Sequence, residues 1–475
     1  MGVLSGLEPK KVFEYFEQIS AVPRGSGNTD RISNYCVTFA KEHGLKYIQD
    51  ELNNVIIFKD GSEGRENEEP VILQGHLDMV WEKNPDCDIC FEKEGLRLKT
   101  DGEFISAEGT TLGGDDGIAV AICLAILDNS SLSHPPLEVV FTVDEEIGML
   151  GATGLDTSSL KGKKLINLDS ESESVLWVSC AGGCKADIYF DMTEQQNNLP
   201  AYELKITGLH GGHSGAEIHK GYANATCLMG MLLRELSQDS PIYVSELKGG
   251  KMSNAITREC SAVICAESFS QERADSFIST IKAIYMLSDP DITLEVKNTT
   301  AQSCFDLASS TKLISFMASM PYGVIRMSDE IEGLVQTSLN PGIAETEGNK
   351  IHIGYSVRSS VNEEKYELIT TLEQMAAKQG AAVETGGDYS AWEYKKESPL
   401  RDKMTEAYKE LFGKDLEVTA IHAGLECGIL AGKIDGLDCV SIGPDMQDIH
   451  TPNEKLSIPS TKRIYDFVVK TLEVL

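Results

Sequence analysis

The chain has 475 residues, more than one ordinary hydrophobic core accommodates, so we expect it to divide into two or three domains. Its 74 acidic residues against 42 basic ones give a formal net charge of -32, which argues against nucleic acid and anionic membrane surfaces as partners. No basic and apolar leader opens the sequence, and the longest apolar run, 118–127, is too short to cross a bilayer. These features predict a soluble, cytoplasmic protein.

The twelve cysteines are scattered, and several lie in apolar periodic stretches, as reduced thiols of a cytosolic protein do. Cys87 and Cys90 form a lone CxxC pair, and Cys180 and Cys184 a lone CxxxC pair. A four-thiolate zinc site would need both pairs to converge, so ordinary thiols are the default interpretation.

The first part of the chain alternates between helical and strand-like patterns. Apolar spacing predicts helices over 8–19 and 30–43. Strands are expected over 46–58 and 71–78, with a polar turn between them. The second strand ends in His76 and Asp78, so it carries an imidazole and a carboxylate at its carboxyl end.

A glycine-rich turn and two adjacent acids precede an apolar helix in segment 110–127. Carboxylates favour helix N-termini, so capping explains either Asp115 or Asp116, but it does not readily explain two acids after paired glycines. The segment also lacks the ladder of acids of an EF-hand and the lysine of a phosphate-binding loop.

Three further strands lead to ligand-type side chains. The run 137–143 is typical of a buried strand and continues directly into Glu145 and Glu146. A strand over 165–169 ends in Asp169, and one over 437–442 leads to His450. Ligands of open α/β sheets bind beyond the carboxyl ends of the strands, so these side chains are expected at one rim.

The character of the chain changes after Asp169, where charge-rich strands and helices form an α+β unit of their own. The strands expected there are 202–207, 261–265, 292–296 and 351–357, and the helices are 222–236, 271–285, 311–320 and 363–378. A helix over 400–411 and a final helix from 461 return to the pattern of the N-terminal part of the chain. Because His450 belongs with the N-terminal rim by its chemistry, we predict an insertion over 188–395 in a catalytic domain made of 1–187 and 396–475.

The rim combines many carboxylates with two imidazoles. Its members are His76, Asp78, Asp115, Asp116, Glu145, Glu146, Asp169 and His450. Zinc takes nitrogen and oxygen ligands of this kind, and catalytic sites leave a position for water. Two ions with five ligands need one bridging carboxylate, and Asp115 after its glycines is the natural bridge. A single such residue would be interpreted as a core histidine or a solvated acid, and a glycosidase pair of carboxylates would leave the histidines without a role.

Five short segments together resemble the dinuclear-zinc metallopeptidases, and most closely their aminoacyl-histidine dipeptidase, or carnosine-hydrolysing, branch. They are GHLDMV (75–80), LGGDDG (112–117), DEEIGM (144–149), NLDSE (167–171) and DIHTP (448–452). The resemblance covers nearly the whole chain. The order and spacing of the five segments together are highly specific. We therefore predict an α/β fold, in which a mixed sheet with helices on both faces carries an inserted α+β lid domain.

The resemblance implies a role for each residue of the rim. His76 and Asp169 would bind one zinc ion, Glu146 and His450 the other, and Asp115 would bridge the two, with cobalt or manganese as substitutes. Glu145 would be the general base, and Asp78 would hydrogen-bond the far nitrogen of His76 and fix its tautomer. Asp116 replaces a neutral amide of relatives, which leaves its role open.

The resemblance extends to the lid, where segment 208–225 matches the one that supplies an oxyanion-stabilising histidine. We assign His213 to that role, with His219 and His210 as competitors. Substrate contacts are implied for Asn254, Arg358, Gly424, Glu426 and His219: arginine suits a C-terminal carboxylate, and Glu426 an imidazole or ammonium group. A salt bridge at the strand edge is the alternative for Arg358.

The predicted activity is metal-dependent hydrolysis of dipeptides, favouring Xaa-His substrates such as β-alanyl-histidine, by a metal-bridged hydroxide with Glu145 as general base. A deacylase of N-acyl amino acids or a broad dipeptidase would use the same chemistry. A catalytically idle metal-binding scaffold is an alternative from another class, and the presence of Glu145 argues against it. The expected partners are a dipeptide and, through the lid, a second copy of the chain.

Overall fold

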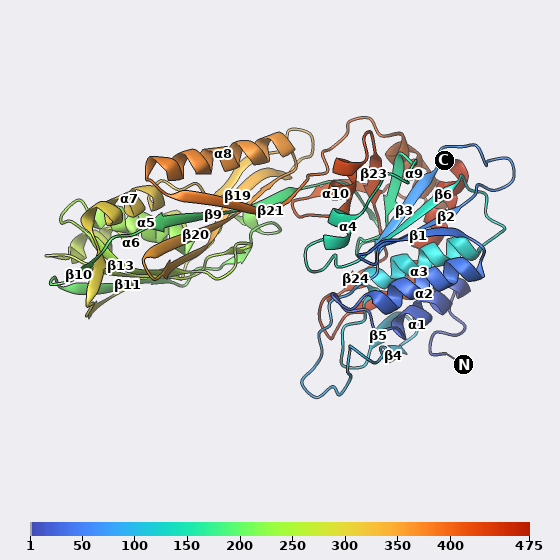
Figure 1. Ribbon diagram of the computed structural model, residues 1–475, viewed down its shortest axis with the longest axis horizontal. Helices are drawn as coiled ribbons and strands as arrows, with labels where there is room; N and C mark the ends of the chain where they lie inside the picture. The colour runs from blue at the N-terminus through green and yellow to red at the C-terminus, as the bar shows by residue number, and fades with distance from the viewer. Residues whose placement is uncertain (1) are drawn as a thin grey trace. The chain divides into compact units, whose positions relative to one another are not determined.

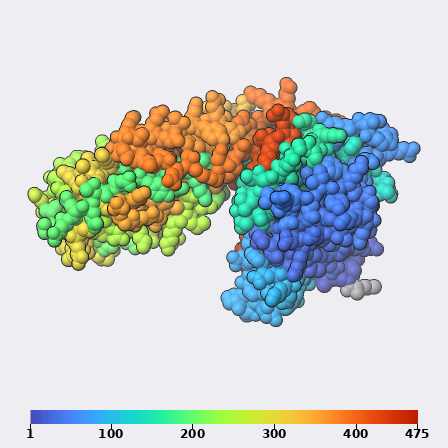
Figure 2. Space-filling view, in the orientation of Figure 1, coloured from blue at the N-terminus to red at the C-terminus, as the bar shows by residue number. Residues whose placement is uncertain are grey.

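Residues 2–475 are described by the computed structural model, and their packing divides the chain into two units (Figure 1). The first unit contains the chain up to Ser179 together with Tyr394–Ala420 and Leu425–Leu475. The second contains Cys180–Glu393 and Ile421–Gly424. Both ends of the chain therefore fold into the first unit, and Figure 2 shows the red C-terminal segment packed against its blue and teal N-terminal surface. Among residues 2–475, none of the helices combines the length and apolar character that crossing a membrane requires.

The first unit is an eight-stranded mixed sheet with its helices and a small four-stranded sheet. Its strands are β1 (Lys46–Gln49), β2 (Val55–Lys59), β3 (Val71–His76), β4 (Leu98–Thr100), β5 (Phe104–Ala107), β6 (Leu137–Thr142), β7 (Lys164–Asn167), β8 (Val175–Cys180), β22 (Glu417–Ile421), β23 (Asp438–Ser441), β24 (Met446–Gln447) and β25 (Lys455–Ser457). Its helices are α1 (Lys10–Ser20), α2 (Asp30–Glu42), α3 (Gly114–Asp128), α4 (Leu150–Gly154), α9 (Pro399–Phe412), α10 (Glu426–Lys433) and α11 (Ile458–Val474).

The strand order of the large sheet is β1-β2-β6-β3-β7-β23-β8-β22. β3 runs parallel to both of its neighbours, β6 and β7, and β7 runs parallel to β23. β3 and β6 are buried along their full length, as expected for central strands covered by helices. Helices α1, α2 and α3 lie together beside this sheet in Figure 1, and α3 is buried almost all round because α1 and β3 both pack on it.

One predicted strand of this unit is wrong. Segment 46–58 is not continuous but forms the antiparallel hairpin of β1 and β2. Asp50 explains the break, because its side chain accepts hydrogen bonds from the backbone N–H groups of Leu52 and Asn54, both at 2.9 Å, and Asn53 adopts a φ of 77°. Asp and Asn favour turns for this reason, and the sequence ELNN carried that signal.

The second unit contains an antiparallel sheet of nine strands with helices packed on it, and two further sheets of two strands each, β10-β17 and β12-β14. Its strands are β9 (Gly182–Asp191), β10 (Glu194–Gln196), β11 (Ala201–Thr207), β12 (Gly212–His213), β13 (Tyr243–Gly249), β14 (Ala255–Ile256), β15 (Cys260–Cys265), β16 (Thr293–Thr299), β17 (Ser303–Phe305), β18 (Gly323–Met327), β19 (Val335–Glu347), β20 (Lys350–Ser359) and β21 (Ala382–Tyr389). Its helices are α5 (Ala225–Leu236), α6 (Gln271–Ile284), α7 (Leu307–Met317) and α8 (Asn362–Lys378), with a 3-10 turn over Ile218–Lys220.

The core of the second unit lies between the helices and one face of its sheet. Alternate residues of the strands enter this core, for example Ile351, Ile353 and Tyr355 of β20. Side chains alternate between the two faces of a strand, so the residues between them point away from the helices. The predicted domain boundary at 187 falls inside β9, whose residues on either side of it, Ala186 and Ile188, both belong to this core.

Candidate metal centre

Parallel strands bring the predicted ligands to one edge of the large sheet. β3 ends at His76, whereas Glu145 and Asp169 follow closely after β6 and β7. Neighbouring parallel strands end at the same edge, so these side chains meet although they are distant in sequence. His450 arrives from the loop between β24 and β25.

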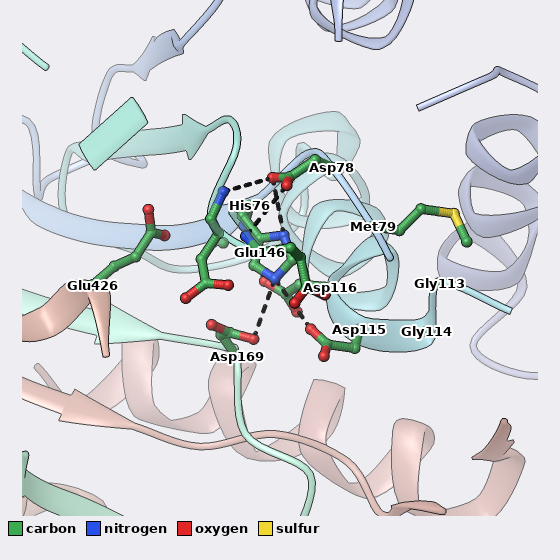
Figure 3. A network of polar contacts seen from close by, with 12 residues as sticks. His76, Asp78, Met79, Gly113, Gly114, Asp115, Asp116, Glu146, Asp169 and Glu426 are labelled. Atoms are coloured by element: carbon green, nitrogen blue, oxygen red, sulfur yellow. Dashed lines mark hydrogen bonds and ion pairs between the residues drawn. The ribbon is translucent and has the colours of Figure 1, made fainter. Parts of the chain in front are cut away.

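Asp115 lies between the two imidazoles of this edge. Its Oδ1 is 3.1 Å from Nε2 of His76, and its Oδ2 is 3.1 Å from Nε2 of His450. His76 Nε2 is also 3.6 Å from Asp169 Oδ1, and His450 Nε2 is 3.0 Å from the carboxylate of Glu146. Figure 3 shows Asp115 and Asp169 together beneath His76. The five predicted ligands therefore form two groups that share Asp115.

Asp78 holds the other side of the His76 ring, with its Oδ1 3.4 Å from Nδ1. It is fully buried, accepts a hydrogen bond from Ser26 Oγ at 2.8 Å, and also accepts the backbone N–H of Glu145 at 3.1 Å. Burial alone would raise the pKa of Asp78, but the adjacent His76 imidazole and the donors Ser26 and Glu145 lower it below its usual range. Asp78 thus stays charged and orients both His76 and the loop that carries Glu145.

The eight carboxylates of this region differ in what they bind. Asp78, Asp116, Glu426 and Glu454 accept hydrogen bonds from backbone N–H groups or from side chains of the scaffold. The side chains of Asp115, Asp169 and Glu146 contact only imidazole within residues 2–475. The side chain of Glu145 accepts no hydrogen bond from residues 2–475. This division separates positioning carboxylates from those available to a ligand.

Asp116 belongs to the positioning group, although its carboxylate also lies within ligand distance of His76 and Asp169. Its Oδ2 accepts the backbone N–H of His76 at 3.1 Å, and burial raises its pKa well above the usual value. The hydrogen bond makes Asp116 a positioning residue, because it fixes the backbone of the residue that carries the imidazole.

The edge carries more negative charge than its histidines offset. Burial raises the pKa of Asp169 to about 8, and the attraction of His76 offsets this only in part. Burial likewise raises the pKa of Glu145 well above its usual value, with further contributions from Asp169 and Glu146. Hydrogen bonds to Asp115 and Glu146 raise the pKa of His450 to about 10. Carboxylate and imidazole donors with uncompensated charge are the ligand set that a pair of divalent cations such as zinc fits.

Two residues missed by the sequence analysis anchor this edge. Glu454 is 2% exposed and accepts four consecutive backbone N–H groups at the start of α3. They are those of Leu112 at 2.7 Å, Gly113 at 3.0 Å, Gly114 at 2.7 Å and Asp115 at 3.4 Å. Since Glu454 follows His450 in the same loop, it ties the shared carboxylate to the histidine that contacts it.

Arg24 holds the same loop from the other side. Its guanidinium is buried and donates to the carbonyl oxygens of Leu77 at 3.0 Å, Asp78 at 2.9 Å and Gly113. Gly113 has a φ of 62°, and a Cβ there would collide with Arg24 and Met79. The close approach of Arg24 therefore explains Gly113, whereas a Cβ on the second glycine, Gly114, would crowd Met446 and Glu454. The acids around Arg24 balance its charge.

In the second unit, His213 is half-buried on β12, which pairs with β14. Its Nδ1 accepts the backbone N–H groups of Gly215 at 3.2 Å and Ala216 at 3.0 Å. Burial and the charge of Arg358 lower its pKa. The ring is therefore neutral near pH 7, and its proton is on Nε2, which leaves that nitrogen as a hydrogen-bond donor.

Arg358 and the loop with Gly424 also come together within the second unit. Arg358 donates to Tyr389 Oη at 3.1 Å, and a Cβ on Gly424 would meet the ring of Tyr389 at 2.8 Å. His422, which the sequence analysis did not assign a role, has Nε2 2.7 Å from Ser338 Oγ. Burial, followed by the charge of Arg358, lowers the pKa of His422 to about 3. No acidic partner of Arg358 was found among residues 2–475, so the alternative of a strand-edge salt bridge is not observed.

The remaining predicted residues lie in different surroundings. Asn254 precedes β14, and its backbone carbonyl accepts the N–H of Ser214 next to His213. His219 is exposed in the 3-10 turn. Glu426 is fully buried at the start of α10, where one oxygen bonds Thr142 at 2.7 Å and Gln74 at 2.5 Å and the other has no partner within residues 2–475.

Known proteins are similar to this chain in sequence and fold. The sequence pattern that defines peptidase family M20/M25/M40 matches residues 72–474. The chain is 34% identical, over 480 aligned residues, to the cytosol non-specific dipeptidase of Escherichia coli, covering 100% of this chain and 99% of that protein. The crystal structure of aminoacylhistidine dipeptidase from Vibrio alginolyticus superimposes with a TM-score of 0.93 at 35% identity, covering 99% of this chain and 98% of that one. The aminopeptidase PepT of Bacillus cereus, at 14% identity and a TM-score of 0.58 over 98% of both chains, shares the fold.

Proposed function

The chain belongs to peptidase family M20/M25/M40, and from this premise we propose that it is a dipeptidase favouring Xaa-His substrates such as β-alanyl-histidine. The predicted α/β fold with its inserted α+β part is confirmed by the match to the Vibrio structure. The observation that carries the proposal is Asp115, whose two oxygens each lie 3.1 Å from a different imidazole. The histidine preference is supported by the activity that the Vibrio protein's name states.

The ligand groups fit two zinc ions, with cobalt or manganese as substitutes. His76 and Asp169 would hold one ion, His450 and Glu146 the other, and Asp115 both. When bound, such ions polarise the peptide carbonyl and make water acidic enough to act as a nucleophile near neutral pH.

Glu145 is the group of this chain that moves the proton. Its side chain accepts no hydrogen bond from the described residues 2–475, whereas its backbone N–H is fixed by Asp78, so the carboxylate is positioned but available. It would take a proton from the attacking water and later deliver it to the leaving amine nitrogen. The same group then returns to its starting state, as turnover requires.

The second unit would supply contacts to the substrate. His213 carries its free proton on Nε2 and would donate it in a hydrogen bond to the developing oxyanion. Arg358 has an Nε without a partner within residues 2–475 and would bind the C-terminal carboxylate, beside Gly424. Asn254, His219 and the free oxygen of Glu426 complete the proposed contacts to substrate. We also propose a cytoplasmic protein that forms a homodimer through the inserted part.

The name of the Escherichia coli relative supports a second candidate, a dipeptidase without histidine preference. Hydrolysis of β-alanyl-histidine and of a panel of ordinary dipeptides and N-acyl amino acids separates these functions. The purified protein is assayed before chelation, after chelation and with zinc restored. We expect activity that is lost on chelation, returns when zinc is restored, and favours substrates with C-terminal histidine. Metal-dependent activity without that preference would favour the second candidate, and a protein that binds two ions but hydrolyses none of these substrates would refute both.

A further inference from the structure

A second group of imidazole and carboxylate side chains lies in the second unit, on the face of its sheet that points away from the helices. His352 of β20 stands directly opposite Glu345 of β19 in the antiparallel register, and Glu347 follows two residues later on the same face. β9 pairs with β20 on its other side and contributes Asp187 and Tyr189 (Figure 1). None of these residues belongs to the metal centre of the first unit.

His352 is held in one orientation. Only 8% of the residue is exposed, and its Nε2 lies 2.8 Å from Asp187 Oδ1. The ring of Tyr189 stacks on the imidazole with a centroid separation of 4.8 Å and an interplanar angle of 15°. A carboxylate at Nε2 favours the proton on that nitrogen, so the lone pair of Nδ1 faces the two glutamates.

The distances across the group suit an ion better than a direct contact. Nδ1 of His352 is 3.6 Å from Glu345 Oε1 and 4.0 Å from Glu347 Oε1. A hydrogen bond would bring these atoms to about 2.7–3.2 Å. A tetrahedral zinc ion with bonds of about 2.0–2.2 Å places its ligand atoms roughly 3.3–3.6 Å apart. The three ligand atoms lie within 4.8 Å of one another, so small side-chain movements would close the site.

The charges around the group also favour a cation. Three carboxylates surround one imidazole, and among residues 2–475 no lysine or arginine forms an ion pair with Glu345 or Glu347. Lys350, the nearest lysine on the hairpin, pairs instead with Asp191 at 3.8 Å. Lys248 of β13 stands opposite Glu345 of β19 and also makes no ion pair with it.

We propose that this group binds a first-row divalent cation, with zinc as the representative ion. His352 Nδ1, Glu345 and Glu347 are the ligands, water takes the fourth position, and Asp187 orients the imidazole. Both glutamate side chains are about half exposed, at 49% and 53%, so the ion reaches the site from solvent. The ion cross-links β19 and β20 near the end of their hairpin, independently of any dipeptidase activity.

The proposal is tested by measuring the number of zinc ions bound per chain of the full-length protein after equilibrium dialysis. His352→Gln is expected to lose one ion relative to the wild type, and the surface variant Glu345→Gln/Glu347→Gln is expected to lose the same ion. Glu384→Gln is the matched control, since Glu384 stands opposite Asp187 on β21 but outside the ligand group, and it is expected to keep the ion.

Repeating the comparison in a His76→Gln/His450→Gln background makes the result independent of the metal centre of the first unit. A loss of one ion caused by His352→Gln in both backgrounds supports the site, even if no dipeptide is hydrolysed. Equal zinc content with and without His352 would overturn the proposal and leave the group as an imidazole bracketed by acids. A loss caused equally by Glu384→Gln would also overturn it, because binding would then depend on general surface charge.

Discussion

Glu454→Gln tests whether the loop that carries Asp115 must be anchored for the metal centre to form. The substitution keeps the size of the side chain but replaces one carboxylate oxygen by an NH2 group. This group is itself a donor, so it cannot accept hydrogen bonds from the backbone N–H groups that it faces. Two of the four contacts are therefore lost. Each hydrogen bond to a charged group contributes roughly 1.5–3 kcal/mol, and a neutral amide is easier to bury, so the expected net loss is about 3 kcal/mol.

The same substitution should also disturb the site itself. Since Glu454 fixes Asp115 relative to His450, its loss lets the shared carboxylate move, and a displacement of about 1 Å can slow a reaction roughly 100-fold. We expect a lower melting temperature, weaker retention of one of the two zinc ions of the metal centre on dialysis, and a fall in kcat. Calorimetry, zinc analysis and hydrolysis of β-alanyl-histidine measure these three quantities.

Glu138→Gln is the matched control. Glu138 is also a buried carboxylate that accepts backbone N–H groups, from Lys161 at 2.9 Å and Gly162 at 3.0 Å, but it lies near the start of β6, away from the edge with the ligands. It should lose stability of similar size while it keeps both ions and its kcat. The reasoning is refuted if Glu454→Gln loses stability but retains zinc and turnover as Glu138→Gln does.

Three further predictions follow from the site. Glu145→Gln should lower kcat about 10²–10⁴-fold without loss of zinc, and unchanged turnover would exclude Glu145 as the base. His213→Ala should lower kcat about 10²–10³-fold with little change in zinc content, whereas a change in KM alone would make it a binding residue. His422 has a pKa of about 3 in the folded chain, below its value of about 6.5 in the unfolded chain. Between these two pKa values, only the unfolded chain binds a proton at His422. Stability should therefore drop by about 2 kcal/mol from pH 7.5 to pH 5.0 through this group, and the pH profile of His422→Gln in urea unfolding should be shallower by that amount.

The convergence of the candidate ligands at one edge of the sheet was predictable from the sequence because its signal is local. His76, Glu145 and Asp169 each end or follow an apolar run that reads as a buried strand, and parallel strands end at one edge. His450 lacks such a strand directly before it and was placed by chemistry and by resemblance. Its arrival in a loop between β24 and β25 follows from long-range packing that no local pattern encodes.

The anchors of the edge were missed because their partners are backbone groups far away in sequence. Nothing near Glu454 marks it as the acceptor for a loop more than three hundred residues earlier. One signal did exist: the paired glycines before Asp115 imply a close approach and unpaired N–H groups, which need an acceptor. Arg24, a lone arginine in the segment PRGSG, carried no comparable signal.

The hydrogen bonds of the carboxylates predict their roles without any appeal to relatives. A buried carboxylate that already accepts backbone N–H groups, such as Asp78 or Glu454, gains little from a cation and would lose its hold on the chain if it turned towards one. Within residues 2–475 the side chains of Asp115 and Asp169 contact only imidazole, so a bound cation would offset the cost of burying them as charged groups. The Glu145 side chain accepts no hydrogen bond from these residues, and burial raises its pKa well above the usual value. By this reasoning Asp116, which holds the backbone of His76, is a positioning residue, and its replacement by Asn should preserve the zinc content whereas replacement of Asp115 should not.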